Sequence, residues 1–402
     1  MEGHQAQLAA AEEEPALDRS RLTRLFAATF CHFVSMGMYI AAVPLFVHFE
    51  LGASRAIVGL AVGSFFPGAI LMRPIIGAGL DSWGRRPFVL VATGIATLTS
   101  LLFLFADSVW FVIMLGLLRG FVGAAYYTGA ATIATDIGPE SRRAEVIALF
   151  SLFLYGGFAI GPGIGEWLAE NVSFSVVWMT AAGLSALAFA FATGLPETLE
   201  LTEEEERPPG GRFGLHRAGL APGLVLVGAA SGYTAITGFA PLYAREIGLA
   251  TSGGLYATFS LTILGFRLVT RKLADRHGRL QIALPGLFMN TLGLATLALF
   301  RSAFAAYLAV AIFGIGFALL FPALMAFTAD RVAESQRGSA MTTFTMFFDF
   351  GALIGTYVVG LIADNLGFGA GFGLPAAMCA LATLGIGARV LFGFGRRQAK
   401  TR

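Results

Sequence analysis

Long apolar runs separated by short charged segments dominate the chain. Each run holds roughly 18 to 26 residues, which is enough for a helix to cross about 30 Å of hydrocarbon. None shows the alternation typical of membrane β-strands, so the expected fold class is an all-α membrane protein. Twelve transmembrane helices are predicted, at approximately 25–48, 57–79, 88–106, 110–134, 145–168, 174–194, 219–243, 253–273, 280–300, 304–328, 339–362 and 368–394.

Polar residues and glycines recur at an offset of 194 residues. A looser match at an offset of 197 pairs Val43–Phe46 with Ala240–Tyr243, as expected if one half carries a small insertion. Two tandem copies predict two pseudo-symmetric six-helix bundles with a binding site where they meet. The matched pairs are Arg73 with Arg267, Asp81 with Asp275, Gly84 with Gly278, Arg85 with Arg279, Asp136 with Asp330, Gly157 with Gly351 and Gly161 with Gly355.

The repeat and the charge pattern predict five segments. Residues 1–24 form a disordered cytoplasmic tail without the features of a signal peptide, and 25–195 form the N-terminal bundle. Residues 196–218 contain four consecutive glutamates followed by Pro-Pro-Gly-Gly and cannot bury apolar surface, so a solvated linker is expected. The C-terminal bundle spans 219–395, and 396–402 form a basic cytoplasmic tail.

Composition supports a bilayer environment. The chain is 56% hydrophobic and 13% charged, against about 25% charged residues in soluble proteins. Most Lys and Arg fall in the segments that would face the cytoplasm, and the outside loops hold only Arg55, Arg245 and Arg301. Both termini are therefore predicted inside, and the net charge of +2 reflects this topology rather than nucleic-acid binding. The excess of Arg over Lys, with heavy Ala and Gly use, favours a bacterial inner membrane.

Enzymatic chemistry has no support in the sequence. No Ser-His-Asp set, metal-ligand spacing or Gly-rich phosphate loop is present. Cys31 and Cys379 lie in apolar spans and are interpreted as buried small residues. We therefore expect no catalytic residue, metal or cofactor, and a protein that acts as a monomer on a small-molecule substrate.

The segment "GAGLDSWGRR" between spans 2 and 3, with a weaker copy "RKLADRHGR" between spans 8 and 9, resembles the loop signature of the major facilitator superfamily. The resemblance covers essentially all of the chain after residue 24. It implies a cytoplasmic gate that stabilises the outward-facing state, in which Asp81 caps a neighbouring helix and Arg85 reaches an acid such as Asp136. Solvated loop charges are the alternative. The gate residues would be Asp81, Gly84, Arg85, Arg86, Asp136, Asp275, Gly278, Arg279 and Asp330.

Span 5 contains "YGGFAIGPGIGEW", which resembles the signature of the superfamily's antiporters and so implies the drug:proton antiporter group. Gly157, Gly161, Pro162 and Gly165 match it, and Glu166 replaces its last glycine. Glycines four residues apart allow close helix approach, and proline removes one helical hydrogen bond. A generic packing seam is the alternative.

Four titratable residues in or beside the spans are candidates for proton coupling: Arg119, Asp349, His32 and Glu166. A charge near the bilayer centre is costly unless it faces a partner or a wet cavity. Arg119 matches an arginine of the superfamily's span-4 signature, which implies a part in proton transfer. Asp349 would carry protons or recognise a cation, or serve as an Arg-paired structural residue. The acid that many drug exporters of the superfamily carry in span 1 or the middle of span 4 is missing here.

Spans 1, 4, 7 and 10 are expected to line a central cavity, with spans 2, 5, 8 and 11 at the interface of the halves. Its side chains would be aromatic and poor in charge, which suits an amphipathic or lipophilic solute. We expect an exporter driven by inward proton flow. A proton symporter or facilitator for a small metabolite and a non-transporting receptor or scaffold are the alternatives. The cavity candidates are Tyr39, Tyr126, Tyr127, Tyr233, Thr237, Asn290, Phe317 and Phe321.

Overall fold

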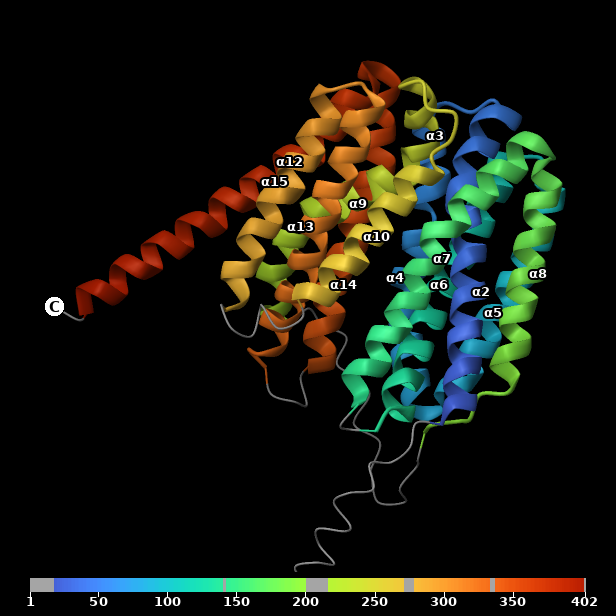
Figure 1. Cartoon of the computed structure of the whole chain (residues 1–402), viewed down its shortest axis with the longest axis horizontal. Coiled ribbons are helices and arrows are strands. Elements are labelled where there is room, and N and C mark those ends of the chain that lie inside the picture. The colour runs from blue at the N-terminus through green and yellow to red at the C-terminus, as the bar shows by residue number, and fades with distance from the viewer. Residues whose placement is uncertain (1–17, 140–141, 200–215, 271–277, 333–336, 401–402) are drawn as a thin grey trace, which may run out of the picture.

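Two bundles of long helices, one from each half of the chain, lie side by side (Figure 1). The structure is a computed structural model that describes residues 18–139, 142–199, 216–270, 278–332 and 337–400. The predicted all-α fold of two similar helical bundles is confirmed. The end of the bundles that carries the turns at residues 51–54 and 247–252 is called the outer end below, as the arginine distribution predicts.

The N-terminal bundle follows the first six predicted spans. Span 2 is divided into two helices, which meet at Ser64. The elements are α2 (Arg19–Leu45) with its extension η1 (Phe46–Glu50), α3 (Arg55–Gly63), α4 (Phe65–Ser82), α5 (Arg85–Leu102) with η2 (Phe103–Phe105), α6 (Val109–Ile137), α7 (Arg143–Asn171) and α8 (Phe174–Thr193).

The C-terminal bundle follows the last six predicted spans. Gly367 divides α15 with a backbone φ of 82°, so spans 11 and 12 meet at this turn. Ten segments in the described ranges are long and apolar enough to cross a membrane; one of them, Ala340–Gly387, includes the turn. With α10 added, the arrangement is consistent with twelve spans. The elements are α9 (Arg217–Glu246), α10 (Gly253–Thr270), α12 (Arg279–Leu299), α13 (Ala303–Ala329), α14 (Arg337–Leu353), η5 (Ile354–Val358) and α15 (Val359–Lys400).

Helix starts are fixed by local sequence. Asp18 accepts hydrogen bonds from the N–H groups of Ser20 and Arg21 at the start of α2. Gly84 and Gly278 precede α5 and α12 with φ of 99° and 87°, values that side chains rarely adopt. The glycine of the repeated loop signature is therefore required by the backbone at both copies.

The surface of the protein carries large apolar side chains, as expected of a protein solvated by lipid. Trp110, Leu299 and Phe304 are 75%, 75% and 78% exposed, while the interior holds many alanines, glycines and small polar residues. This distribution, together with the apolar helices, indicates a multi-pass membrane protein.

The glycine seam predicted in span 5 occurs twice. Gly161 packs on α2, where an added Cβ would lie 3.1 Å from the Cα of Gly37. Its counterpart Gly355 packs in the same way on the carbonyl group of Ser231 in α9. Each half thus locks its fifth helix to its first through backbone contact.

Candidate functional site

A buried ion pair joins the two bundles. Arg73 of α4 donates from Nε to Asp349 Oδ2 at 2.6 Å and from Nη2 to Oδ1 at 3.1 Å. The side chain of Asp349 is only 4% exposed and that of Arg73 is 27% exposed. Removing one partner of a buried pair leaves the other charge uncompensated, at a cost of about 3–5 kcal/mol. The pair therefore links the halves strongly for as long as the carboxylate stays charged.

An aromatic pocket lies between the bundles, on the outer side of this ion pair. The space between its walls, counted together with the part open to solvent, is about 320 Å³, and only a small fraction of it is enclosed in this arrangement of the halves. The walls come from α2 and α7 of the first half and from α9 and α10 of the second, so any movement between the halves changes its shape. Its lining is Ile40, Tyr155, Phe158, Pro162, Tyr233, Thr237, Tyr256, Phe259 and Ser260.

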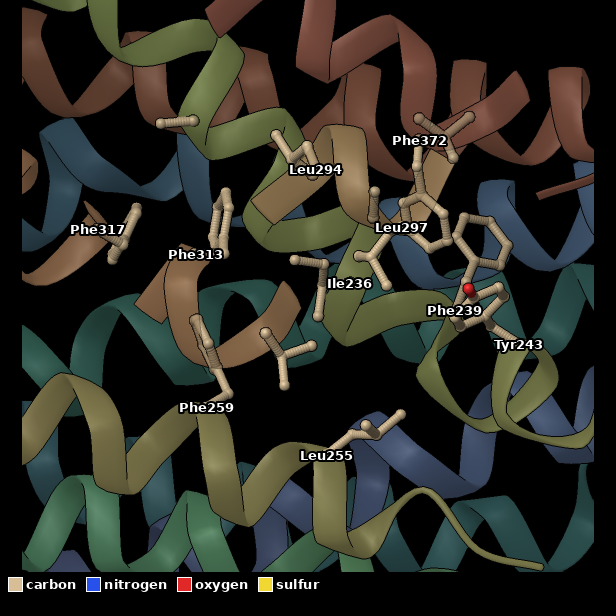
Figure 2. Packing of buried hydrophobic residues seen from close by; sticks show 14 of the residues in the cluster. Ile236, Phe239, Tyr243, Leu255, Phe259, Leu294, Leu297, Phe313, Phe317 and Phe372 are labelled. Atoms are coloured by element: carbon tan, nitrogen blue, oxygen red, sulfur yellow. The ribbon is translucent and has the colours of Figure 1, made fainter. Parts of the chain in front are cut away.

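A row of stacked rings supports the pocket from the C-terminal bundle. Tyr233 stacks on Phe317 with ring centroids 5.2 Å apart, and Phe317 stacks on Phe321 at 5.8 Å. Figure 2 shows Phe317 next to Phe313, on which it also stacks, with Phe259 below Phe313 and the core residues Leu294 and Leu297 beside them. The pocket wall on this side is therefore backed by a packed aromatic and aliphatic core.

A second arginine reaches across the same interface. The guanidinium of Arg267 in α10 lies 5.0 Å from the ring centroid of Tyr155 in α7. Its Nε has no hydrogen-bond partner in the described part of the chain. Arg267 thus approaches the other half in the same way as Arg73, but it meets a ring and not a carboxylate.

Arg119 and His32 lie inside the N-terminal bundle, away from the ion pair. Arg119 is 3% exposed, donates to the hydroxyl group of Ser100 and lies 4.9 Å from the ring of Tyr39. His32 stacks on Tyr126 with centroids 3.8 Å apart. Both ring nitrogens of His32, the hydroxyl of Tyr39 and Arg119 Nε lack hydrogen-bond partners among the described residues. Such buried polar atoms are costly and mark a candidate functional cluster.

Glu166 belongs to a contact that closes the outer end. Its carboxylate accepts from the N–H group of Ser252 at 2.6 Å and from the Ser252 hydroxyl at 2.7 Å, where α10 begins. Nearby, Arg245 of the second half pairs with Glu170 of the first at 2.5 Å.

A matching contact involves α3. Asp364 of α15 accepts from the N–H groups of Arg55 and Ala56 at 2.8 and 3.1 Å. The Arg55 side chain also pairs with Glu246 at 3.0 Å. On each side of the interface, therefore, an acid of one half caps a helix of the other. We call the Glu166 and Asp364 contacts together the outer latch.

At the inner end each half contains one of the ion pairs that the repeat suggested. Arg85 and Asp136 lie 3.5 Å apart, and Arg279 and Asp330 lie 3.1 Å apart. Arg86 donates to the carbonyl oxygen of Thr193 at 2.7 Å. The side chain of Asp81 and the whole of Asp275 lie outside the described residues.

Glu197 caps the start of α5, next to the loop in which the sequence suggested a capping role for Asp81. Its two carboxylate oxygens accept from the N–H groups of Arg85 and Arg86 at 2.9 and 3.1 Å, at the start of α5. The next residue, Thr198, donates to Asp136 at 2.6 Å. The beginning of the expected linker is therefore part of the inner surface of the N-terminal bundle.

The predicted cavity residues separate into four groups: lining, supporting, exposed and buried within one bundle. Tyr233 and Thr237 line the pocket, Phe317 and Phe321 support it, and Tyr127 is 52% exposed. Tyr39 and Tyr126 are buried in the N-terminal bundle, and Asn290 is buried in the C-terminal bundle.

Sequence reasoning missed Tyr155, Phe158, Tyr256 and Phe259, which lie on spans 5 and 8. The expectation that these spans form the interface between the halves was the one signal that pointed to them.

Comparison with known proteins agrees with the fold. The model of the Major Facilitator Superfamily matches residues 25–332 and 223–401. An uncharacterized MFS-type transporter of Salmonella typhimurium is 28% identical over 373 residues, which cover 90% of this chain and 94% of that protein. A transporter of Burkholderia mallei with the same description is 28% identical over 391 residues, covering 94% and 93% of the two chains.

Solved structures of transporters share the fold. The nucleoside transporter NupG, as its D323A mutant, superposes with a TM-score of 0.78 at 15% identity and covers 91% of this chain and 99% of its own. The human organic anion transporter MFSD10 gives a TM-score of 0.67 at 16% identity, covering 92% and 100%. The matched family model spans both bundles and the site between them, and the chain belongs to the Major Facilitator Superfamily of membrane transporters.

Proposed function

We propose that the protein exports amphipathic small molecules across a bacterial inner membrane by alternating access, in exchange for protons. The ion pair between Arg73 and Asp349 carries this proposal. It is a buried, titratable contact that bridges the two bundles on the inner side of the aromatic pocket. Protonation of Asp349 removes its charge and weakens the contact, so proton binding biases the relative position of the halves.

Other contacts also support alternating access between the two sides of the membrane. The outer latch holds the outer ends together, and the charged clusters around Arg85 and Arg279 would act as the cytoplasmic gate when the inside closes. The glycine seam keeps each half rigid, so that the halves rock as bodies. Arg119 and His32 would assist proton movement within the N-terminal half. Both termini would face the cytoplasm, and one copy of the chain would suffice.

Flux measurements on reconstituted protein test the proposal. A vesicle interior more acidic than the medium should accelerate uptake of amphipathic fluorescent dyes, because protons leave as dye enters. Asp349→Asn should abolish this acceleration while the variant remains folded. Asp107→Asn, in the exposed loop before α6, is the matched control and should behave like the parent.

The sign of the gradient distinguishes the alternatives. Acceleration only by an acidic medium would indicate proton symport, and equal rates under both gradients would indicate a facilitator. An Asp349→Asn variant with unchanged acceleration would remove this residue from the coupling mechanism.

A further inference from the structure

Each half contributes one arginine to the interface, at the same position of the repeat, but the two arginines contact different kinds of side chain. Arg267 is the repeat counterpart of Arg73, and Tyr155 is the counterpart of Asp349, both at an offset of 194 residues. Arg73 makes a two-bond ion pair with Asp349. Arg267 lies over the ring of Tyr155. The two-fold relation between the halves therefore pairs one arginine with a carboxylate and the other with a phenol.

Among the residues that the structure describes, Arg267 consequently has no counter-charge. In the described part of the chain it has no hydrogen bond or ion pair, and its Nε is buried without a partner. A neutral ring attracts a guanidinium less than a carboxylate does, because a carboxylate accepts two parallel charge-assisted hydrogen bonds. An uncompensated cation at membrane depth is costly unless a ligand or water reaches it. The half-buried side chain is open to such a ligand.

The aromatic pocket begins beside this arginine. Tyr155 both contacts Arg267 and lines the pocket. Tyr233, another lining residue, lies within electrostatic range of Arg267. Phe259 precedes Arg267 by two turns of α10, about 12 Å along the helix axis. Once movement of the halves widens the pocket, a ligand of modest size can therefore place a negative group at Arg267 and a ring or alkyl body among the aromatic walls.

We infer that Arg267 binds the negatively charged group of the transported molecule, which is an organic monoanion with an aromatic or apolar body, such as an aromatic carboxylate. The inference rests on the proposed function, since it assigns a substrate class to the same pocket. Within the described ranges, a second negative charge on the ligand has no further unpaired cation to meet at this level of the interface, because Asp349 already neutralises Arg73.

Equilibrium binding tests the assignment without requiring transport. Purified full-length protein is titrated with benzoate, 2-naphthoate and indole-3-acetate, each beside its neutral amide, and binding is measured by calorimetry. At least one carboxylate should bind about tenfold or more tightly than its amide, since the carboxylate alone forms charge-assisted bonds. Arg267→Gln should remove this preference and leave amide affinity unchanged.

The second variant is Tyr155→Asp. It places a carboxylate opposite Arg267, as Asp349 already stands opposite Arg73. The introduced carboxylate should form an ion pair with Arg267 and so block anion binding. The apparent melting temperature of this variant should stay equal to that of the parent or rise. Asp107→Asn, in the exposed loop before α6 and outside the pocket lining, is the control and should bind the carboxylate like the parent.

Three results would overturn the inference: no preference of the parent for any carboxylate, full preference in Arg267→Gln, or full preference in Tyr155→Asp. These results are independent of proton coupling. If gradient-driven flux also depends on Asp349, the proposed function stands and only the substrate class falls. If anion binding follows Arg267 but no gradient drives flux, the substrate class stands and the coupling proposal falls.

Discussion

Asp364 caps the helix that starts at Arg55, although the two residues lie 309 positions apart and belong to different bundles. Glu166 caps α10 in the same manner from the opposite half. Acids at helix N-termini are favourable because they satisfy free N–H groups and oppose the helix dipole. The outer end is thus closed by helix capping in both directions.

Breaking the outer latch should therefore favour an outside-open state. We expect the double variant Asp364→Asn, Glu166→Ala to shift the balance between states several-fold, since each hydrogen bond contributes about 0.5–1.5 kcal/mol. Distances between spin labels at Val172→Cys and Leu366→Cys, both exposed at the outer end, measure this shift. Glu50→Gln, an exposed acid at the same end, is the control. Unchanged distance distributions in the double variant would contradict the latch.

The glycine seam should tolerate no added methyl group. Gly161→Ala and Gly355→Ala each place a Cβ against backbone atoms of the facing helix, and overpacking of this kind costs about 1–3 kcal/mol. The apparent melting temperature in detergent should fall for both. Gly183→Ala in α8 meets nothing within 4 Å and should keep or slightly raise it. Equal melting temperatures for all three variants would show that the seam can relax.

The cap of α5 predicts a dependence of stability on pH. Burial, the largest single influence on Glu197, favours its neutral form, but hydrogen bonds from the N–H groups of Arg85, Leu199, Arg86 and Thr198 outweigh it and hold its pKa below the usual value. A lowered pKa gives stability that is fully present above about pH 4.3, the usual value for Glu, and is lost as pH falls through the folded-state pKa.

Melting temperature followed through this acidic range checks the prediction. Glu197→Gln should lower the melting temperature at neutral pH and reduce its fall on acidification. Parallel curves for parent and variant would exclude a contribution of this carboxylate.

Arg119 should be costly to stability and necessary for activity. Its guanidinium is buried, and its described contacts are a hydroxyl group and a ring but no carboxylate. Replacing such a group with an apolar residue of similar length is often neutral or stabilising. Arg119→Met should therefore keep or raise the melting temperature while losing gradient-driven flux. A lower melting temperature with normal flux would identify Arg119 as a structural residue.

The sequence was sufficient to predict the fold of two similar bundles. Charged residues are rare in this apolar chain, so each charged residue that recurs at the 194-residue offset is informative. Asp136 and Asp330, with the arginines that face them, could be paired from the repeat alone, since short loops bring these helix ends together. Gly84 and Gly278 could be placed for the same reason.

Contacts between the halves could not be predicted in this way. Arg73 stands out in the repeat, but its partner lies 276 positions away, and helices that are apolar on every side do not reveal which face meets the other half. Tyr155 is one aromatic residue in a chain with 37 Phe and 9 Tyr, and the repeat places it at the position of Asp349. Only the relative position of the bundles shows that its ring faces Arg267 of the other half.

The donors of the outer latch include main-chain amides of residues 55, 56 and 252. An amide of this kind survives every substitution except proline, so mutation at those positions can hardly abolish the closed arrangement. Glu166 and Asp364 are the acceptors of these bonds, and a substitution can replace either one with a weaker acceptor. We therefore expect relatives that open outward more or less readily to differ at these two positions.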